Sequence, residues 1–256
     1  MKEKEFNYYE SQGNWDFSDM KRKTEKLTNW NLYEVIRKYT NQQSLCLDLG
    51  TGGGEKVLKY YPEVGMVIGT DYSKAMITTA KENQKQYPEK RVTFTCMDSL
   101  NMTFPEETFD LISARHTCID ANQVYQALKP GGVIVIQGVD QKDCWDLKEM
   151  FGRGQAFHDE ISISQKDYDD LKEAGFTKIE KIEILQNEYY ETEQDLMALL
   201  LKAPILDDFS EVNNEDFEHK PRIEQDIFEA YVKKYKIEKG ILLKRVLYGI
   251  VAKKEL

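Results

Sequence analysis

The sequence has few of the residues from which metal centres and disulfides are built. Its 256 residues include only 4 cysteines and 3 histidines. No Cys-x-x-Cys pair occurs, and no histidine lies at metal-ligand spacing from a cysteine. These residues are scattered along the chain as Cys46, Cys96, Cys118, Cys144, His116, His158 and His219. We therefore expect neither a disulfide nor a metal ion.

Excess positive charge and long apolar runs are also lacking. The 35 Lys and Arg residues are outnumbered by 45 Asp and Glu residues, which gives a net charge of −10. A nucleic-acid or membrane-surface binder would need a positive field, so we expect neither partner. No stretch of about 18 apolar residues could span a bilayer, and residues 1–10 carry charges where a secretory signal has an apolar core. These features predict a cytoplasmic protein, and both a monomer and a dimer are compatible with them.

The composition is otherwise that of an ordinary globular protein, with 41% hydrophobic residues, 31% charged residues, 15 Gly and 6 Pro. Between residues 45 and 137, short apolar runs alternate with helical patterns, which is typical of βαβ units and a parallel sheet. The predicted strands are 45–49, 66–71, 92–95, 109–113 and 133–137, and the predicted helices are 55–60, 73–87 and 121–128. The turn 129–132, Lys-Pro-Gly-Gly, is expected to stop the last helix.

The flanking segments extend this pattern. Residues 1–28 show no clear hydrophobic periodicity and are interpreted as a lid or a tail. The pattern of residues 29–39 predicts a helix that leads into the core. Beyond the core, 164–174 predict a helix, and 178–188 and 241–252 predict strands. A mainly helical insertion at about 192–238 separates these strands. Residues 29–256 are therefore expected to form one domain that contains this insertion.

The most informative segment is a glycine-rich turn after the first buried strand. It reads Asp48-Leu-Gly-Thr-Gly-Gly-Gly-Glu55 and leads directly into a helix. Glycine lets the backbone adopt positive φ and come close to a ligand. A Walker loop would end in Gly-Lys-Ser/Thr, and a dinucleotide fingerprint would have glycine where this chain has Glu55. The pattern that this chain does have is Asp48-x-Gly50-x-Gly52-x-Gly54, with an acidic residue at the end of the strand.

The next two strands also end in acidic residues. Asp71 closes the second strand, where an acidic residue can bind both hydroxyls of a ribose; its alternative role is to cap the helix that starts at Ser73. Asp98 follows the third strand and could accept a hydrogen bond from an adenine amino group; its alternative role is to cap a turn. Such a row of acidic residues would suit a cationic or hydroxyl-rich nucleoside.

These residues, together with the segment 127–135, Ala-Leu-Lys-Pro-Gly-Gly-Val-Ile-Val, closely resemble class I S-adenosylmethionine-dependent methyltransferases. The resemblance covers about residues 29–252. It implies an α/β fold with a doubly wound, Rossmann-like sheet of seven strands, mostly parallel with one antiparallel strand, and helices on both faces. The long insertion within the last pair of strands departs from the family pattern.

The resemblance also implies the cofactor, S-adenosyl-L-methionine. In the family, the glycine loop lies under the methionine part, the acid of the second strand binds the ribose, and the acid of the third contacts adenine. Carried over to this chain, the cofactor-binding residues are Asp48, Leu49, Gly50, Thr51, Gly52, Gly54, Asp71, Tyr72, Met76, Met97, Asp98, Ser99, Ala114 and Arg115.

Methyl transfer from a sulfonium is an in-line displacement with a neutral leaving group, so the enzyme mainly supplies alignment and excludes water. If the acceptor must lose a proton, His116, after the fourth strand, is the candidate catalytic base; the alternative is a histidine packed against the next helix. The acceptor is expected to bind outside the common core, at Trp15, Trp145 and Arg153. The alternative is that these side chains simply cover the sheet.

A small-molecule acceptor is therefore predicted. An RNA-base methyltransferase shares the same core, but the net charge of −10 weakens this alternative. A further alternative is a non-catalytic sensor that binds the cofactor and presents the insertion to a partner. The glycine spacing argues against an NAD-dependent oxidoreductase.

Overall fold

The computed structural model describes residue 17 and residues 19–207 and 223–256. Its strands are β1 Arg22–Lys26, β2 Leu45–Leu49, β3 Met66–Asp71, β4 Val92–Cys96, β5 Phe109–Arg115, β6 Leu128–Val139, β7 Thr177–Tyr190, β8 Lys236–Ile237 and β9 Gly240–Lys253. Its helices are α2 Leu32–Tyr39, α3 Glu55–Tyr60, α4 Lys74–Gln84, α5 Ala121–Ala127, α6 Trp145–Phe151, α7 Ile163–Glu173, α8 Glu193–Lys202 and α9 Gln225–Tyr235.

Within the described residues, the strands form one nine-stranded sheet. Their order is β1-β7-β9-β6-β5-β2-β3-β4, and β8 pairs with β9 beside this path. The strands β4, β3, β2, β5 and β6 are parallel, whereas β9 runs antiparallel between β6 and β7. The predicted doubly wound α/β fold is confirmed. The sheet has nine strands rather than the expected seven because β1 and β8 add to it.

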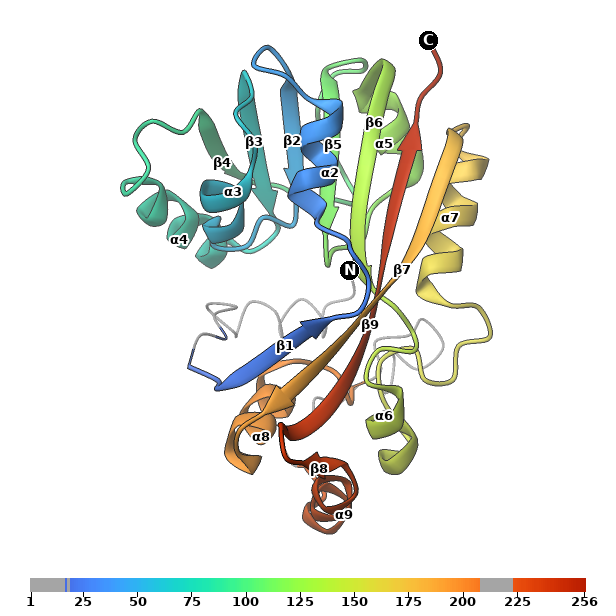
Figure 1. Cartoon of the computed structure of the whole chain (residues 1–256). Helices are drawn as coiled ribbons and strands as arrows, with labels where there is room; N and C mark the ends of the chain where they lie inside the picture. The colour runs from blue at the N-terminus through green and yellow to red at the C-terminus, as the bar shows by residue number, and fades with distance from the viewer. Residues whose placement is uncertain (1–16, 18, 208–222) are drawn as a thin grey trace.

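Helices cover both faces of the parallel strands (Figure 1). On one face, α2, α3 and α4 pack against residues such as Cys46 and Leu111. On the other face, α5 and α7 pack against residues such as Leu47 and Ile112. Because side chains alternate along a strand, β2 and β5 supply apolar groups to both cores. This explains why their sequences are continuously hydrophobic.

The strand β6 is longer than its apolar run. It begins at Leu128, immediately after α5, and includes the turn 129–132 that was expected to lie outside it. The pairing with β5 shifts register between Phe109 and Leu111, and Gly131 has a positive φ of 77°. A bulge of this kind lets a Pro-Gly-Gly segment stay in a sheet.

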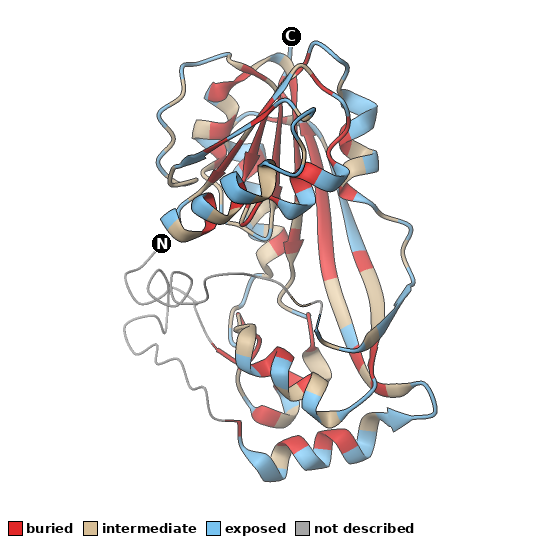
Figure 2. Ribbon diagram, turned by 90° about the vertical axis from the view of Figure 1, so that its left-hand side faces the viewer, coloured by how far each residue is buried: buried red, intermediate tan, exposed pale blue. Residues whose placement is uncertain are grey.

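The strands β7 and β9 have 14 residues each and run past the parallel strands into a second lobe. This second lobe contains β1, β8, α6, α8 and α9 (Figure 1). It has its own hydrophobic core, which includes Leu147, Tyr190, Leu196, Phe228 and Leu243. Figure 2 shows buried segments on the lower helices, apart from the buried strands of the larger lobe. The mainly helical insertion at 192–238 thus contributes α8 and α9 to the second lobe.

Part of the N-terminal segment 1–28 is a strand, which the sequence did not predict. The strand β1 pairs antiparallel with β7, with Arg22 opposite Tyr190 and Lys26 opposite Gln186. Its sequence, Arg-Lys-Thr-Glu-Lys, has no apolar alternation because most of its side chains are exposed at the end of the sheet. The proposed domain boundary at residue 28 remains a prediction.

The described helices are short. Three of them, α4, α7 and α9, have 11 residues each, and none of the described helices is long and apolar enough to cross a membrane. Among the described residues, no group of three or more His, Cys, Asp or Glu side chains could hold a metal ion. The cysteines Cys46, Cys96, Cys118 and Cys144, all of which lie in the described part of the chain, are not joined in disulfides.

Candidate functional site

The carboxyl ends of the parallel strands meet at the edge of the sheet that faces the second lobe (Figure 1). The glycine turn follows β2 at this edge, Asp71 ends β3, and Asp98 follows β4. Backbone hydrogen bonds join these segments: Thr51 N–H donates to Thr70 O at 2.8 Å, and Met97 N–H donates to Asp71 O at 3.0 Å. The structure therefore brings the predicted acidic residues and the glycine turn together.

The glycine turn has a left-handed backbone at alternate positions. Gly50, Gly52 and Gly54 have φ values of 69°, 57° and 75°. A Cβ atom on Gly50 would lie 2.6 Å from Thr117 Cβ, and one on Gly54 would lie 2.8 Å from Phe94 Cζ. One on Gly52 would meet no atom of the described part of the chain within 4 Å. Gly50 and Gly54 are thus required by packing. The space beside Gly52 is open and leaves room for a ligand to approach the backbone.

The first acidic residue, Asp48, lies beneath this turn and is 4% exposed. Its Oδ1 atom accepts a 2.6 Å hydrogen bond from Ser113 Oγ. Burial raises the pKa of Asp48 to about 6, although the Ser113 hydrogen bond and the Arg115 charge lower it. Thr51 also lowers this pKa, yet its buried Oγ1 atom has no hydrogen bond of acceptable geometry among the described residues. The site thus contains a buried acid beside an unsatisfied hydroxyl group.

The second acidic residue, Asp71, organises the backbone around it. Its Oδ2 atom accepts a hydrogen bond from Gly52 N–H, and its Oδ1 atom accepts one from Ser73 N–H, both at 2.9 Å. Asp71 thus contributes to the start of α4 by accepting from Ser73 N–H, and the N-cap residue itself is Ser73, which accepts from Met76 N–H. A carboxylate oxygen has further acceptor capacity, so these bonds leave the predicted ribose contact feasible. Tyr72, next in the chain, is exposed.

The third acidic residue, Asp98, also shapes a turn. Its Oδ1 atom accepts a hydrogen bond from Leu100 N–H at 2.9 Å, which is the turn-capping role considered above. Ser99 Oγ donates to Cys118 O at 2.8 Å and so connects this turn to the segment after β5. Of the other predicted cofactor residues, Leu49, Met76 and Ala114 are buried, and Met97 is half-buried. Their contact with a cofactor remains a prediction.

The end of β5 carries two basic side chains, Arg115 and His116. His116 has a left-handed backbone with φ of 55°, and its N–H group donates to Gln137 O at 2.9 Å. The surrounding protein keeps the pKa of His116 well below its usual value, and the charges of Arg115 and Arg245 add to this effect. The residue as a whole is exposed. A lowered pKa favours the neutral imidazole, which is the form that can accept a proton.

Two of the predicted acceptor residues, Trp145 and Arg153, lie in or next to α6 of the second lobe. Trp15 is outside the described residues. Trp145 begins α6, and its ring centroid is 5.0 Å from that of Phe157. Arg153 donates to Leu206 O at 2.6 Å and to Glu224 Oε2 at 3.0 Å, so its guanidinium group already joins parts of the second lobe. Its role in acceptor binding remains a prediction.

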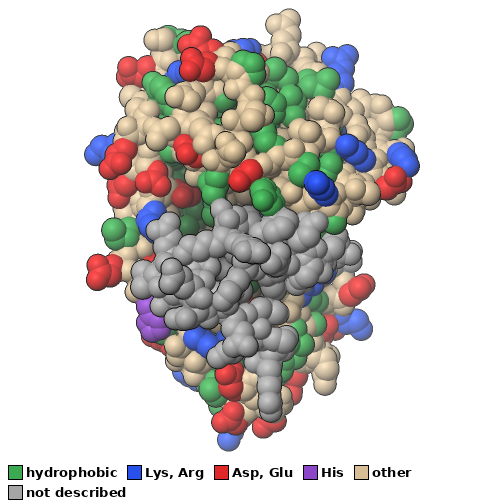
Figure 3. Space-filling view, turned by 180° about the vertical axis from the view of Figure 1, so that it is seen from behind, with side chains coloured by type: hydrophobic (Ala, Val, Ile, Leu, Met, Phe, Trp, Pro, Cys, Tyr) green, Lys and Arg blue, Asp and Glu red, His purple; other side chains and the backbone are tan. Residues whose placement is uncertain are grey.

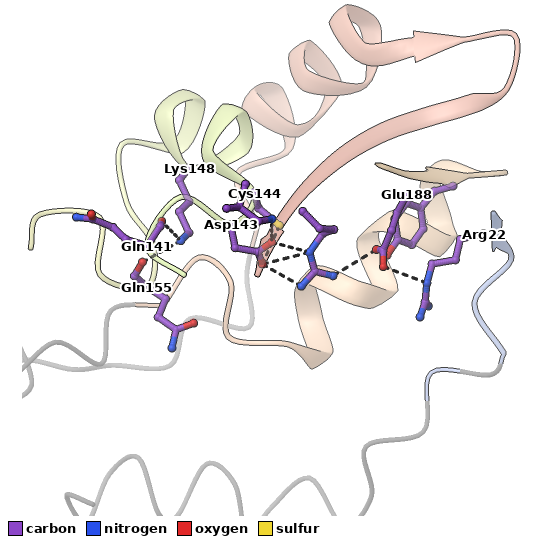
Figure 4. Close-up of polar contacts among 10 residues, drawn as sticks. Arg22, Gln141, Asp143, Cys144, Lys148, Gln155 and Glu188 are labelled. Carbon is purple, nitrogen blue, oxygen red and sulfur yellow. Dashed lines mark hydrogen bonds and ion pairs between the residues drawn. The ribbon is translucent and has the colours of Figure 1, made fainter. Parts of the chain in front are cut away.

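The structure contains a largely buried ion-pair network that the sequence analysis did not predict (Figure 4). Arg245 Nε and Nη2 each donate to the Asp143 carboxylate at 2.9 Å, and Arg245 Nη1 lies 3.3 Å from Glu188 Oε2. Arg22 Nε of β1 lies 3.6 Å from Glu188 Oε1. This network joins β1, β7, β9 and the segment after β6. Arg245 and Asp143 are 102 positions apart, so no local pattern could reveal the pair.

Comparison with known proteins identifies the family of this fold. A family model for a methyltransferase domain matches residues 41–200. The chain belongs to the methyltransferase family. The resemblance inferred from the glycine turn, the acidic residues and the Leu-Lys-Pro-Gly-Gly segment is thus confirmed.

Two curated relatives are quinone methyltransferases by name. The chain is 33% identical over 118 residues to a 2-phytyl-1,4-naphtoquinone methyltransferase of Nostoc punctiforme, covering 42% of this chain and 51% of that protein. It is 25% identical over 134 residues to a demethylmenaquinone methyltransferase of Bacteroides fragilis, covering 49% of this chain and 53% of that protein. The chain thus spans about half the length of these relatives.

Solved structures show the same fold. The YcgJ protein of Bacillus subtilis has a TM-score of 0.55 and 16% identity, covering 88% of this chain and 98% of that chain. A functionally unknown protein of Deinococcus radiodurans has a TM-score of 0.58 and 12% identity, covering 99% of both chains. At such identities, the likeness is one of fold alone.

Proposed function

We propose that this methyltransferase-family protein binds S-adenosyl-L-methionine at the glycine turn and transfers its methyl group to a small molecule. The observation that carries the proposal is the geometry at Gly52. An added Cβ atom on its left-handed backbone would meet no atom of the described residues within 4 Å. The Gly52 N–H group donates to Asp71, and the buried acid Asp48 precedes the turn. Membership of the methyltransferase family supports methyl transfer as the reaction at this site.

The residues at this edge fit the cofactor. S-Adenosylmethionine, when bound, supplies a methyl group on a cationic sulfonium. The carboxylates of Asp48, Asp71 and Asp98 offer negative charge and acceptor oxygens to a cationic nucleoside. The buried Oγ1 atom of Thr51 lacks a well-formed hydrogen bond among the described residues, and a polar ligand group could satisfy it. The protein would bind and align the cofactor rather than react with it.

A small molecule suits the surface better than a nucleic acid does. The net charge of −10 opposes binding to phosphates. On the face shown in Figure 3, the Lys and Arg side chains are scattered among acidic ones. The relatives named above act on quinones by name, which supports an organic acceptor without identifying it. We keep a cytoplasmic location as part of this proposal.

His116 is the proposed base for an acceptor that must lose a proton. Its lowered pKa keeps the imidazole neutral at pH 7, so no proton blocks the accepting nitrogen. Its position directly after β5 places it at the same edge as Arg115 and the glycine turn. An acceptor that is already nucleophilic would not need this step, and the His116→Gln variant would then retain its rate.

The proposal is tested by calorimetric titration with S-adenosylmethionine, S-adenosylhomocysteine and NAD. We expect micromolar binding of both sulfur nucleosides and none of NAD. Asp71→Asn should weaken binding at least tenfold, because one accepting carboxylate oxygen is replaced by an amide nitrogen that only donates, and the negative charge is lost. Asp169→Asn, which changes an exposed acid on α7, is the matched control and should bind like wild type.

The outcomes separate the alternative functions. Binding of NAD without either sulfur nucleoside would overturn the proposed cofactor. Binding of S-adenosylmethionine followed by methyl transfer to RNA, and not to phenolic or quinol acceptors, would overturn the small-molecule acceptor. Binding without transfer to any acceptor class would favour the sensor.

A further inference from the structure

Ser113 of β5 lies beside Asp48 of β2 in the parallel sheet. The two residues are register partners, and their side chains point to the same face as Cys46 and Leu111, two residues earlier on each strand. Ser113 is 0% exposed and Asp48 is 4% exposed. The 2.6 Å distance from Ser113 Oγ to Asp48 Oδ1 is at the short end for a hydroxyl–carboxylate hydrogen bond.

Tyr61 extends this contact into a chain of hydrogen bonds. It follows α3, is 3% exposed, and places its hydroxyl oxygen 3.2 Å from Ser113 Oγ. A serine hydroxyl has one proton to donate, and a charged carboxylate only accepts. If Ser113 donates to Asp48, then Tyr61 must donate to Ser113. The chain therefore runs from Tyr61 to Ser113 to Asp48, and each bond polarises the next.

We propose that Ser113 and Tyr61 are positioning residues that keep the Asp48 carboxylate charged and oriented toward the cofactor. The proposal rests on the function proposed above. Ser113 and Tyr61 are buried, and their hydrogen bonds lead to Asp48, so we assign them a role through Asp48 rather than in direct contact with the cofactor. Removal of either hydroxyl should change the protonation of Asp48 while the glycine turn stays in place.

The other groups that face Asp48 set the direction of this effect. They are Tyr33 of α2, Cys46 of the same strand, Tyr61 after α3, Asp71 of β3 and Arg115 of β5. Burial raises the pKa of Asp48 to about 6, the Ser113 bond and Arg115 lower it, and Asp71 raises it. Loss of the Ser113 hydroxyl therefore moves this pKa upward. As the pH is lowered, the variant without this hydroxyl group should then lose affinity for a cationic cofactor at a higher pH than wild type does.

The test is the affinity for S-adenosylmethionine measured by calorimetry between pH 5 and 8.5. Wild type should lose affinity as the pH falls through about 6, where Asp48 becomes protonated. A hydrogen bond to a carboxylate moves its pKa by about one unit. Ser113→Ala should therefore raise the midpoint by about one unit, with an affinity about fivefold lower at pH 6 and nearly unchanged at pH 8.5.

Three further variants separate positioning from general damage. Ser113→Thr keeps the hydroxyl group and should restore the wild-type midpoint. Tyr61→Phe removes the second donor and should shift the midpoint in the same direction by less. Ser164→Ala removes a similar buried bond, from Ser164 Oγ to Asp140 Oδ2 at 2.9 Å, outside the proposed site. This control should leave the midpoint unchanged.

The outcomes distinguish this inference from the function on which it rests. If wild type fails to bind S-adenosylmethionine at any pH, the proposed function is wrong. If wild type binds and both Ser113→Ala and Tyr61→Phe keep its midpoint, only the positioning role is overturned. An equal loss of affinity at every pH also overturns it, because that result indicates altered packing. Should Ser113→Ala not fold, the midpoint of Tyr61→Phe decides the question.

Discussion

Replacing Gly52 with alanine distinguishes a ligand site from a merely tight turn. Gly52 has φ of 57°, and an added Cβ atom would meet no atom of the residues that the structure describes within 4 Å. Gly152, at the end of α6 in the second lobe, has φ of 64° and an equally open surrounding. Both substitutions therefore impose the same backbone strain and neither creates a clash with the protein. They differ only in whether a cofactor is proposed to fill the space.

The expected loss of stability follows from the backbone. A left-handed conformation costs about 1–2 kcal/mol for a residue with a Cβ atom. Alanine also restricts the unfolded chain, which offsets about 0.4–1 kcal/mol of this cost. The free energy of unfolding of each variant should thus be about 1 kcal/mol lower than that of wild type. This corresponds to a melting temperature about 2–4 °C lower.

Binding should separate the two variants. We expect Gly52→Ala to weaken S-adenosylmethionine binding at least tenfold, because the new methyl group occupies the open space, whereas Gly152→Ala should bind like wild type. Thermal unfolding gives the stability, and calorimetry gives the affinity. Equal affinities for Gly52→Ala and wild type would refute the proposed place of the cofactor. An equal loss in both variants would show that strain, and not contact, controls binding.

Three other predictions concern the surroundings of the site. Arg245→Ala leaves the buried Asp143 carboxylate without its partner and should lower the unfolding free energy by about 3–5 kcal/mol in urea denaturation; a loss below 1 kcal/mol would contradict this. Burial raises the pKa of Asp167 to about 6. The protonated carboxyl group therefore stabilises the folded state below pH 4, and this contribution is lost as the pH rises through 6. Asp167→Asn keeps an acceptor for the Tyr248 hydroxyl group and should gain stability relative to wild type, on the order of 2 kcal/mol, between pH 4 and 7.5; a gain independent of pH would contradict this. His116→Gln should lower the turnover number without changing cofactor affinity, and a reduced affinity with unchanged turnover would contradict its role as a base.

Local patterns were enough to predict the strands and helices of the larger lobe. The predicted strands 45–49 and 66–71 and the helix 55–60 have the observed bounds. These elements combine buried apolar runs with glycine turns, and both signals lie within a few residues. The acidic residues at the strand ends were predictable for the same reason, because parallel strands place their carboxyl ends at one edge.

The second lobe could not be predicted in the same way. The strand β1 has no apolar alternation and is stabilised by pairing with β7, more than 160 positions away in the sequence. The network around Arg245 likewise joins residues from β1, β7 and β9 and from the segment after β6. Ser113 offered only a weak signal, a polar residue inside an apolar strand, and its partner Asp48 is 65 positions earlier. Such contacts depend on the assembled sheet rather than on local sequence.

The most direct test of the central claim is a crystal structure of the protein grown with S-adenosylhomocysteine. The account predicts density for the nucleoside along the carboxyl edge of the parallel strands, with its amino-acid part over Gly52, its ribose at Asp71 and its adenine near Asp98. Density at another place, or no nucleoside density over the glycine turn in crystals saturated with the nucleoside, would contradict the account.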